Sequence, residues 1–548
     1  MNPNLKIMFI GGVGEVGKNC TALQFGDDIL VIDAGVAFPD GDMPGIDLVI
    51  PDYTWLKENK DKVKGIVITH AHEDHIGSMP YLIDEVKAPI YGSRLTLALI
   101  ENKLREFPQL HARANIVKPK SVVRLGSFVV EFINVNHSVA GSYALAITTP
   151  IGVVFVSGDF KIDYTPLAGE TTDLARIGEI GNRGVLLMMC ESTNVERPGH
   201  SISERTVGEN LEELFKSSVN NRMIVTSFST NVHRMQQIMD LAKKYKRKVA
   251  FAGRSLITNM ETAMKIGEVI YDNQLIIDID KVKSVPHNEL LILATGSQGQ
   301  PTTALSRMAN GEFNNVQIGS QDTIIYSSQP VPGNESLVNN SINDLIKLGA
   351  EVIYDDVHAS GHAYEEEIKI FHALVKPKFF LPMHGEYKHL KLHNALAVSM
   401  GMNPKNIIMP EIGMVVEVSA TSMKAAGTIP AGKRLIDGLG VGDEESIVLR
   451  DRKQLAEDGM CVVAVGINSN QGRVTSGPDI ITRGLIYSQE AESILQEAKR
   501  AVEKALSEMD LRTEDRAVIK SNIRRSLSNL FYKKTKRRPM ILPIILDA

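Results

Sequence analysis

The sequence predicts a multidomain α/β protein, and three observations support this prediction. At 548 residues the chain is too long to fold around a single hydrophobic core. Short β-like runs fill roughly the first 200 residues, whereas helix-like and strand-like segments alternate from about Ser203 onward, as in a parallel α/β layer. A third region begins near Arg450 and contains a long amphipathic helix.

The individual elements are predicted from apolar alternation, helical periodicity and the turn residues between them. Strands are expected at Leu5–Ile10, Thr21–Phe25, Ile29–Ile32, Gly65–Thr69, Val122–Leu125, Phe128–Val135, Ser142–Thr148, Val153–Ser157, Met223–Thr226, Val249–Ala252 and Leu290–Ala294. Helices are expected at Met79–Glu85, Ser93–Arg105, Glu204–Ser217, Asn231–Tyr245 and Ala491–Met509. Gly427–Gly442 carries five glycines and no strong periodicity, which indicates a linker.

Composition and cysteine usage exclude several classes of protein. The hydrophobic content of 43% and charged content of 23% are typical of a soluble globular protein. Three widely separated cysteines match no paired metal spacing, which indicates a reducing compartment without a disulfide framework. The N-terminus has no secretory signal pattern, and no apolar run is long enough to cross a bilayer. We therefore expect a cytoplasmic protein with no membrane partner.

Charge is distributed unevenly along the chain. The formal net charge of −5 argues weakly against a polyanionic partner. Between Asp515 and Asp547, however, there is no acidic residue, and basic side chains accumulate at Lys520, Arg524, Arg525, Lys533, Lys534, Lys536, Arg537 and Arg538. Such a run is either a solvated face or a surface that contacts phosphate groups or another subunit.

The run His70-Ala71-His72-Glu73-Asp74-His75 carries the strongest chemical signal. Only 14 of the 548 residues are histidine, yet three of them share six positions with two carboxylates directly after an apolar segment. Imidazole nitrogens and carboxylate oxygens are ligands that Zn²⁺ and Mn²⁺ prefer, and a strand end directs them toward one point. A polar loop that is merely rich in histidine would not need this crowding. The run therefore predicts a metal site.

Later segments supply the further ligands that a site for two metal ions needs. His137 and Asp159 each follow a strand-like segment, and His384 ends the later apolar run Phe379–Met383. A single histidine beyond a strand is more often structural. These three positions together, however, complete the coordination that the first run begins.

Gly12–Gly17 matches two nucleotide-binding patterns but lacks the element that both require. It has the GxGxxG spacing of a dinucleotide site, with Asp33 about twenty residues further on, and its continuation into Lys18-Asn19 is similar to a P-loop. Both sites need a helix directly after the glycines, whereas here a strand, a turn and a second strand follow. We therefore predict a tight loop beside the metal site, with N–H groups able to contact a substrate phosphate.

These motifs together resemble those of a known family. Thr69–His75 with His137 and Asp159 resembles the metallo-β-lactamase fold, a four-layer αββα sandwich. Three further segments resemble the motifs of its β-CASP nucleic-acid-processing branch, namely Cys190–Asn194, Ala359–His362 and Pro382–Glu386. With Val448–Gly459 and the basic C-terminal region, the chain resembles bacterial ribonuclease J over nearly its whole length.

The resemblance implies how the α/β domains are arranged. A β-CASP α/β domain would be inserted within the metallo-β-lactamase αββα sandwich, because His384 completes a site that begins before residue 160. A small α+β domain would follow. The expected limits are 1–206 and 376–430 for the two parts of the sandwich, 207–375 for the β-CASP domain, 431–449 for the linker and 450–548 for a C-terminal assembly domain.

The resemblance also implies a ligand set and catalytic roles. His70, His72 and His137 would hold one metal ion, and Asp74, His75 and His384 a second, with Asp159 bridging the two. Two divalent ions are expected per subunit, with Zn²⁺ as the default and Mn²⁺ or Mg²⁺ as alternatives. Asp74 would orient the attacking hydroxide, Glu191 would orient its neighbours, and His362 would protonate the departing 3′-oxygen.

The implied substrate is single-stranded RNA, cleaved 5′-to-3′ as an exonuclease and also internally, in rRNA maturation and mRNA decay. A pocket preferring a 5′-monophosphate is expected to involve Ser229, Thr230, His233, His358, Ser360, Gly361 and His362. Alternatively, Ser229 and Thr230 only cap a helix. The implied protein partners are further copies of the chain in a dimer or tetramer, a paralogous subunit and other RNA-decay proteins.

Three other functions remain open at this point. A small-molecule hydrolase, acting on a thioester or lactam, would use the same metal core without an inserted domain or β-CASP motifs. A non-catalytic partner subunit would be expected to lose metal ligands or His362, all of which are present. A β-CASP DNA nuclease would commonly differ at the third motif, where a histidine such as His384 is typical of RNA-processing members.

Overall fold

The structure, a computed structural model, describes residues 4–331, 333–438, 440–443, 447–486 and 491–547. The chain divides into two units, a larger one of residues 1–38 and 49–433 and a smaller one of residues 39–48 and 434–548. The expected strands and helices all occur, with ends displaced by at most two residues. Among the described residues, no helix combines the length and the apolar character needed to cross a membrane.

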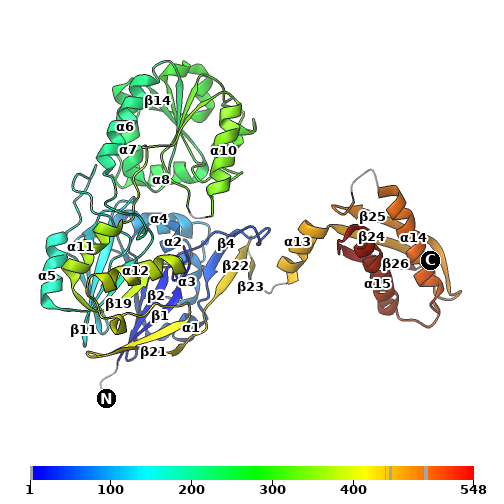
Figure 1. Cartoon of the computed structure of the whole chain (residues 1–548). Helices are drawn as coiled ribbons and strands as arrows, with labels where there is room; N and C mark the ends of the chain where they lie inside the picture. Colours follow the sequence, from blue (N-terminus) through cyan, green and yellow to red (C-terminus); the bar gives the residue numbers. More distant parts are fainter. Residues whose placement is uncertain (1–3, 332, 439, 444–446, 487–490, 548) are drawn as a thin grey trace. The chain divides into compact units, whose positions relative to one another are not determined.

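Two β-sheets form the centre of the larger unit (Figure 1). The first has the order β21 (Met423–Thr428), β20 (Met414–Val418), β1 (Leu5–Gly11), β2 (Cys20–Phe25), β3 (Asp28–Ile32), β5 (Val63–Val67), β6 (Ile90–Gly92) and β7 (Ala114–Ile116). The second has the order β19 (Pro377–Met383), β12 (Val185–Glu191), β11 (Gly152–Val156), β10 (Ser142–Thr149), β9 (Phe128–Val135) and β8 (Val122–Leu125). The glycine motif lies between β1 and β2, and β1, β2 and β3 pair antiparallel. A strand and not a helix therefore follows the motif, as predicted.

The two sheets pack face to face, and helices cover their outer faces. Between the sheets, Phe9 and Leu23 of the first share a buried apolar cluster with Phe132 and Leu145 of the second. The outer face of the first sheet is covered by α1 (Thr54–Glu58), α3 (Met79–Glu85) and α4 (Arg94–Leu104). The outer face of the second is covered by α5 (Leu174–Arg183), α11 (Glu365–Val375) and α12 (Tyr387–Ser399). This arrangement is the αββα sandwich that the resemblance implied.

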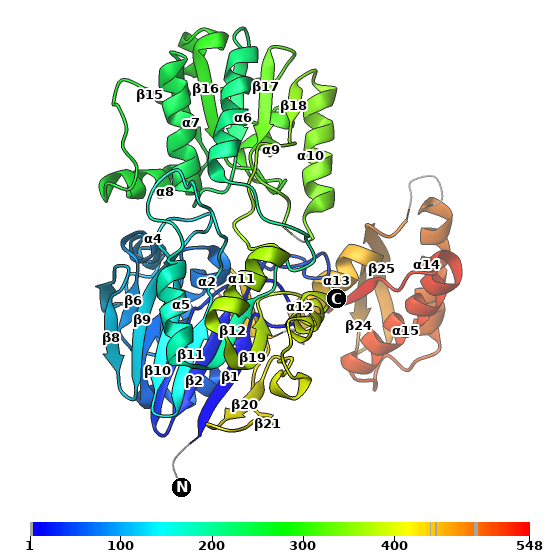
Figure 2. The ribbon, with the colours of Figure 1, turned by 60° about the vertical axis from the view of Figure 1, so that its left-hand side comes forward.

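A third sheet builds the domain inserted between β12 and β19 (Figure 2). Its strands are all parallel, in the order β15 (Ile276–Ile277), β14 (Lys248–Ala252), β16 (Leu290–Ala294), β13 (Arg222–Thr226), β17 (Asp322–Tyr326) and β18 (Glu351–Ile353). The helices are α6 (Glu204–Ser217), α7 (Val232–Lys244) and α8 (Arg254–Lys265) on one face, and α9 (Ala304–Ala309) and α10 (Glu335–Lys347) on the other. Burial on both faces explains why strands such as β16 are continuously apolar.

The smaller unit is an α+β domain with its own core. Its sheet has the order β25 (Arg473–Arg483), β24 (Met460–Asn468) and β26 (Met540–Asp547), and its longer helices are α14 (Ala491–Ser507) and α15 (Arg516–Thr535). The helix α14 is the long amphipathic helix that the sequence predicted, and its apolar face packs within this core through Ile494, Ala498, Val502 and Leu506. Several short elements also occur in the chain. They are α2 (Glu73–Ile76), α13 (Ile447–Asp458), β4 (Leu48–Pro51) and the 3₁₀ turns Lys60–Lys62, Ile279–Ser284, His287–Glu289 and Pro404–Asn406.

The glycine-rich stretch 427–442 differs from the linker that we expected. It contains the end of β21 and two further strands, β22 (Lys433–Asp437) and β23 (Gly440–Asp443), which pair antiparallel. Gly438, at a φ of 57°, lies between them in the left-handed conformation that glycine adopts without strain. Only Leu435 and Ile436 of β22 are buried, so these strands are too short to produce a detectable apolar alternation.

Candidate metal centre

All seven predicted metal ligands meet at strand ends of the two sandwich sheets. The histidine run follows β5 and enters α2, while His137, Asp159 and His384 follow β9, β11 and β19. The ligand atoms form two groups that share Asp159, namely His70, His72 and His137, and Asp74, His75 and His384. Within each group these atoms all lie within 4.8 Å of one another. The structure therefore brings together the ligand set that the family pattern implied.

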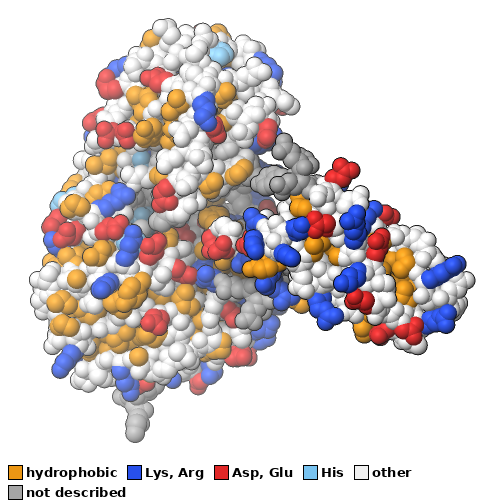
Figure 3. Space-filling view, turned by 45° about the vertical axis from the view of Figure 1, so that its right-hand side comes forward, with side chains coloured by type: hydrophobic (Ala, Val, Ile, Leu, Met, Phe, Trp, Pro, Cys, Tyr) orange, Lys and Arg blue, Asp and Glu red, His pale blue; other side chains and the backbone are white. Residues whose placement is uncertain are grey.

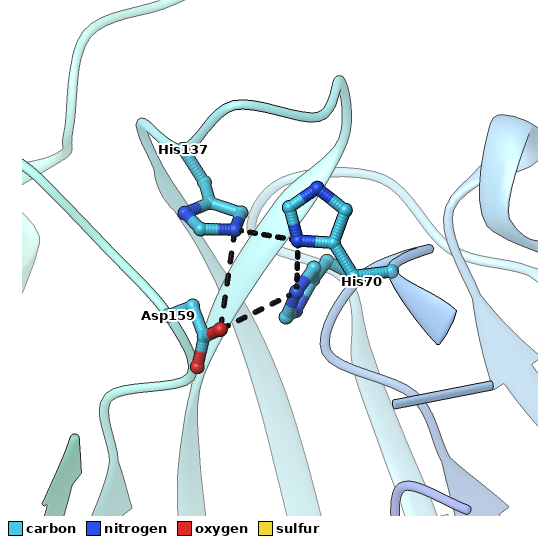
Figure 4. A group of neighbouring side chains, drawn as sticks. His70, His137 and Asp159 are labelled. Carbon is cyan, nitrogen blue, oxygen red and sulfur yellow. Dashed lines mark hydrogen bonds and ion pairs between the residues drawn. The ribbon is translucent and has the colours of Figure 1, made fainter. Parts of the chain in front are cut away.

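The first group has the spacing of a metal coordination shell. His70, His137 and Asp159 point toward one another (Figure 4). Asp159 Oδ2 lies 3.5 Å from His70 Nε2 and 3.9 Å from His137 Nε2. His72 Nδ1 lies 3.2 Å from His70 Nε2 and 2.9 Å from His137 Nε2. Nitrogen ligands at about 2.0–2.1 Å from a tetrahedral Zn²⁺ would stand roughly 3.3 Å apart, so these separations suit an ion.

The second group lies on the other side of Asp159. Asp159 Oδ2 is 3.3 Å from His75 Nε2 and 3.2 Å from His384 Nε2, while Asp74 Oδ2 is 3.5 Å and 3.6 Å from the same two nitrogens. Asp159 Oδ2 is buried and has no hydrogen-bond partner among the described atoms. A buried carboxylate oxygen needs compensation for its lost hydration, and divalent cations held by the two groups would provide it.

The environment keeps the first group in the form that binds metal. Burial, which disfavours the imidazolium, lowers the pKa of His70 and His137 well below the usual histidine value and that of His72 to about 4. These imidazoles are thus neutral near pH 7. Burial also opposes protonation of His75, but nearby Asp159, Asp74 and Asp33 outweigh it and raise the His75 pKa. A cation among the same carboxylates would act in the opposite direction.

Asp33 is a site residue that the sequence analysis missed. Its carboxylate contacts His75 Nδ1 at 2.8 Å and accepts hydrogen bonds from the backbone N–H and hydroxyl of Thr69, both at 2.8 Å. These contacts fix the histidine run against the end of β3 and direct His75 Nε2 toward Asp74 and Asp159. The sequence did contain a signal for Asp33, because this residue directly follows a predicted strand. The same position identified His137 and Asp159 as ligands.

The glycine loop lies beside the site, as predicted. Gly12 O accepts a hydrogen bond from His384 N at 3.0 Å, and Glu15 forms a β-bridge with Gly385. His384 has a φ of 52°, a strained conformation for a residue other than glycine. Its carbonyl oxygen also accepts a hydrogen bond from Ser192 N at 3.2 Å. These contacts hold His384 in the orientation that directs its ring toward Asp159.

A third group places the predicted general acid at the edge of the metal site. His362 Nδ1 lies 2.6 Å from Glu191 Oε2 and 3.8 Å from Asp159 Oδ2. Burial would lower the pKa of His362, but the charge and hydrogen bond of Glu191 outweigh it and raise the pKa to about 9. Glu191 is itself fixed by the Phe160 N–H at 2.8 Å. The arrangement therefore favours the protonated form of an imidazole beside the ligand groups.

The predicted substrate-binding residues have different places. Ser360 and Gly361 adjoin the site, since Gly361 O accepts from His137 Nδ1 at 2.7 Å and Ser360 Oγ accepts from the His362 N–H at 3.2 Å. Of the other predicted histidines, His362 belongs to the third ligand group, whereas His233 and His358 belong to none. Ser229 contacts Asn259 and His233 contacts Glu268, whereas Thr230 is buried and His358 is half-buried. Asn231 caps α7, so the alternative that Ser229 or Thr230 caps it is wrong.

Four family models match successive parts of the chain. The metallo-beta-lactamase superfamily matches residues 13–176, and the ribonuclease J beta-CASP domain matches residues 220–345. The Zn-dependent metallo-hydrolase RNA specificity domain matches residues 346–410, and the ribonuclease J C-terminal domain matches residues 447–548. The matched ranges agree with the sandwich, the inserted domain and the smaller unit described above.

Two curated relatives and a solved structure are similar to the chain over most of its length. Ribonuclease J2 of Bacillus subtilis is 39% identical over 100% of this chain and 99% of its own, and ribonuclease J of Synechocystis is 43% identical over 92% and 79%. A crystal structure from Enterococcus faecalis, described as a protein of unknown function, aligns with a TM-score of 0.53 at 17% identity. That alignment covers 76% of this chain and 100% of the other, and it shows similarity of fold alone. On its sequence, domains and site, the chain belongs to the ribonuclease J family.

Proposed function

We propose that this chain, a hydrolytic nuclease of the ribonuclease J family, shortens single-stranded RNA from the 5′ end and also cleaves it internally. One observation carries the proposal. Two ligand groups share Asp159, and a third group adds His362, whose pKa Glu191 raises. Phosphodiester hydrolysis needs an activated water, neutralisation of phosphate charge and a proton for the departing oxygen. We further propose that the substrates include mRNA and rRNA precursors.

The roles of the residues follow from their positions. Two divalent ions, when bound, lower the pKa of water and neutralise phosphate oxygens. Asp74 Oδ2 accepts a hydrogen bond from Asn19 Nδ2 at 3.2 Å, which fixes the carboxylate beside His75 and His384, where it would orient the attacking hydroxide. His362 contacts Glu191 through Nδ1, so its Nε2–H is the group that would donate to the 3′-oxygen. Five imidazoles favour Zn²⁺, while the two carboxylates also accept Mn²⁺ or Mg²⁺.

The 5′ end of the RNA should control the exonuclease rate. Thr226 Oγ1 at the end of β13 and Ser328 Oγ after β17 are buried without partners among the described atoms, at the strand ends where ligands of parallel sheets bind. We expect 5′-monophosphate RNA to be degraded faster than triphosphate RNA, which is bulkier, or hydroxyl RNA, which lacks the charge. Gel assays of matched RNAs with these three ends measure the rates. Equal rates on all three would contradict the pocket, and equal turnover of single-stranded DNA would contradict the RNA preference.

The smaller unit should assemble subunits rather than carry chemistry. Its described residues contain no potential metal-ligand group. One face of its sheet exposes the apolar side chains of Ile481, Leu542, Ile544 and Leu546, with 39–57% of each accessible. Lys and Arg side chains lie on the surface of this unit among Asp and Glu (Figure 3). We propose that the apolar face joins copies of the chain, or a paralogue, into a dimer or tetramer, to which other RNA-decay proteins bind.

Removal of residues 450–548 should therefore give a smaller assembly. We expect intact metal content and impaired action on long RNA, because the ligand groups lie wholly in the larger unit. Light scattering measures the mass of the assembly, and metal analysis serves as the control. A full-length Leu542→Asp, Ile544→Asp variant separates loss of this face from loss of the whole domain. The same number of chains per assembly as in the wild type, in both variants, would rule the interface out.

A further inference from the structure

Four of the five ligand histidines have an oxygen atom in contact with their second ring nitrogen, and the fifth, His384, does not among the described atoms. In each of those four, the ring nitrogen turned away from the ligand group contacts an oxygen atom. The contacts are His70 Nδ1 with Thr69 Oγ1 at 3.1 Å, His72 Nε2 with Ser138 Oγ at 3.3 Å, His75 Nδ1 with Asp33 Oδ2 at 2.8 Å and His137 Nδ1 with Gly361 O at 2.7 Å. His384 Nδ1 is buried and has no hydrogen-bond partner among the described atoms.

The missing contact matters because His384 directs Nε2 toward Asp74 and Asp159. A neutral imidazole that offers the Nε2 lone pair to a metal carries its proton on Nδ1. Metal-ligating histidines almost always donate that second N–H to an acceptor, which fixes the tautomer and the ring orientation. A buried N–H without an acceptor loses its hydration without compensation. An acceptor for His384 Nδ1 must therefore be found nearby.

A small cavity that adjoins the second ligand group, and that His75 and Asp159 also line, offers the place for one. It has a volume of about 20 Å³ and is lined by residues that include Asn19, Thr21, Asp33 and His384. A cavity of this size accommodates one water molecule, provided that two to four polar groups can bind it.

Two other residues that line the cavity also carry a buried polar atom without a hydrogen-bond partner among the described atoms. Asn19 Oδ1 and Thr21 Oγ1 are both buried without a hydrogen-bond partner among the described atoms. The three residues are 2–3% exposed. The orientation of the Asn19 amide is fixed, since its Nδ2 donates to Asp74 O at 3.0 Å and to Asp74 Oδ2 at 3.2 Å. Three residues that each carry a buried, unsatisfied polar atom thus line one water-sized cavity.

We propose that this cavity is a hydration site, whose water molecule accepts hydrogen bonds from His384 Nδ1 and Thr21 Oγ1 and donates one to Asn19 Oδ1. The inference rests on the metal centre proposed above. It makes Thr21 and Asn19 positioning residues for His384, and through His384 for the ion of the second group. Asn19 would then link both ends of that group, because its amide nitrogen already holds Asp74.

The test replaces the Thr21 hydroxyl without changing side-chain volume. In full-length Thr21→Val protein, we expect chelator competition to show the ion of the second group bound about 10- to 100-fold more weakly, with the other ion unaffected. Thr21→Ser keeps the hydroxyl and should bind both ions as the wild type does. Equal affinity of the Val variant and the wild type for the second ion would overturn the proposal. A wild-type protein that binds no metal would instead contradict the proposed function.

A second measurement remains decisive if the Val variant fails to fold. A high-resolution crystal structure of the wild-type protein should show one ordered water within hydrogen-bond distance of His384 Nδ1, Thr21 Oγ1 and Asn19 Oδ1. A cavity without an ordered water, or a water that contacts none of the three atoms, would overturn the proposal.

Discussion

The His72→Ala variant should lose RNA hydrolysis and part of its bound metal, while its fold stays largely intact. His72 Nδ1 lies 3.2 Å and 2.9 Å from the Nε2 atoms of His70 and His137, so its removal opens the first ligand group. A two-metal mechanism fails when either ion is lost. Asp74→Ala should have the same effect through the second group. Metal analysis, circular dichroism and an RNA cleavage assay on each purified variant measure the three properties.

A matched control separates this effect from the general cost of replacing a histidine. His111 is exposed and lies outside every ligand group of the described residues, so His111→Ala should retain metal and activity. Wild-type turnover by a metal-depleted His72→Ala protein would remove the basis for the ligand assignment.

The His362→Ala variant should retain both metals and RNA binding, yet lose about 10²-fold or more in the chemical step. His362 is in neither of the two groups that would hold the ions, and its Nδ1 contact with Glu191 leaves Nε2 as the proton donor. Single-turnover kinetics with saturating enzyme report the chemical step, and filter binding reports RNA affinity.

Glu191→Gln provides the companion variant for this prediction. It preserves the shape of the side chain but removes the charge that keeps the His362 pKa near 9. We expect its chemical step to be slowed while its metal content stays at the wild-type level. A normal single-turnover rate in His362→Ala would mean that His362 is structural and that the proton donor lies elsewhere.

The ligand set was predictable because each ligand is encoded locally. His137, Asp159 and His384 each follow an apolar strand, and the ends of neighbouring strands meet at one edge of a sheet. Their partition into two groups came from the family resemblance, and the side chains lie in the same two groups in the structure. Asp33 was missed because its spacing from the glycine motif directed attention to a nucleotide site. Its contact with His75 depends on β3 and β5 pairing, which sequence periodicity does not report.

The contacts of the predicted substrate-binding residues and the strands in the expected linker could not be predicted from the local sequence. His233 was chosen for its neighbours in sequence, yet its ring contacts Glu268, which follows α8. The partner of a side chain on α7 depends on how helices pack, and that contact has no local signature. The same holds for β22 and β23, whose pairing satisfies backbone groups in a segment with little apolar pattern. The β-CASP domain, in contrast, was predictable, because strands buried on both faces are continuously apolar.

One titration tests the central claim, that two metal ions held by these groups hydrolyse RNA. Metal-free full-length protein would receive Zn²⁺ or Mn²⁺ in steps, and bound metal and cleavage of 5′-monophosphate single-stranded RNA would be measured in the same samples. We expect cleavage to be absent without metal and to reach its maximum when two ions are bound per chain. Full cleavage in the chelated protein, or saturation of both groups without any cleavage, would contradict the claim.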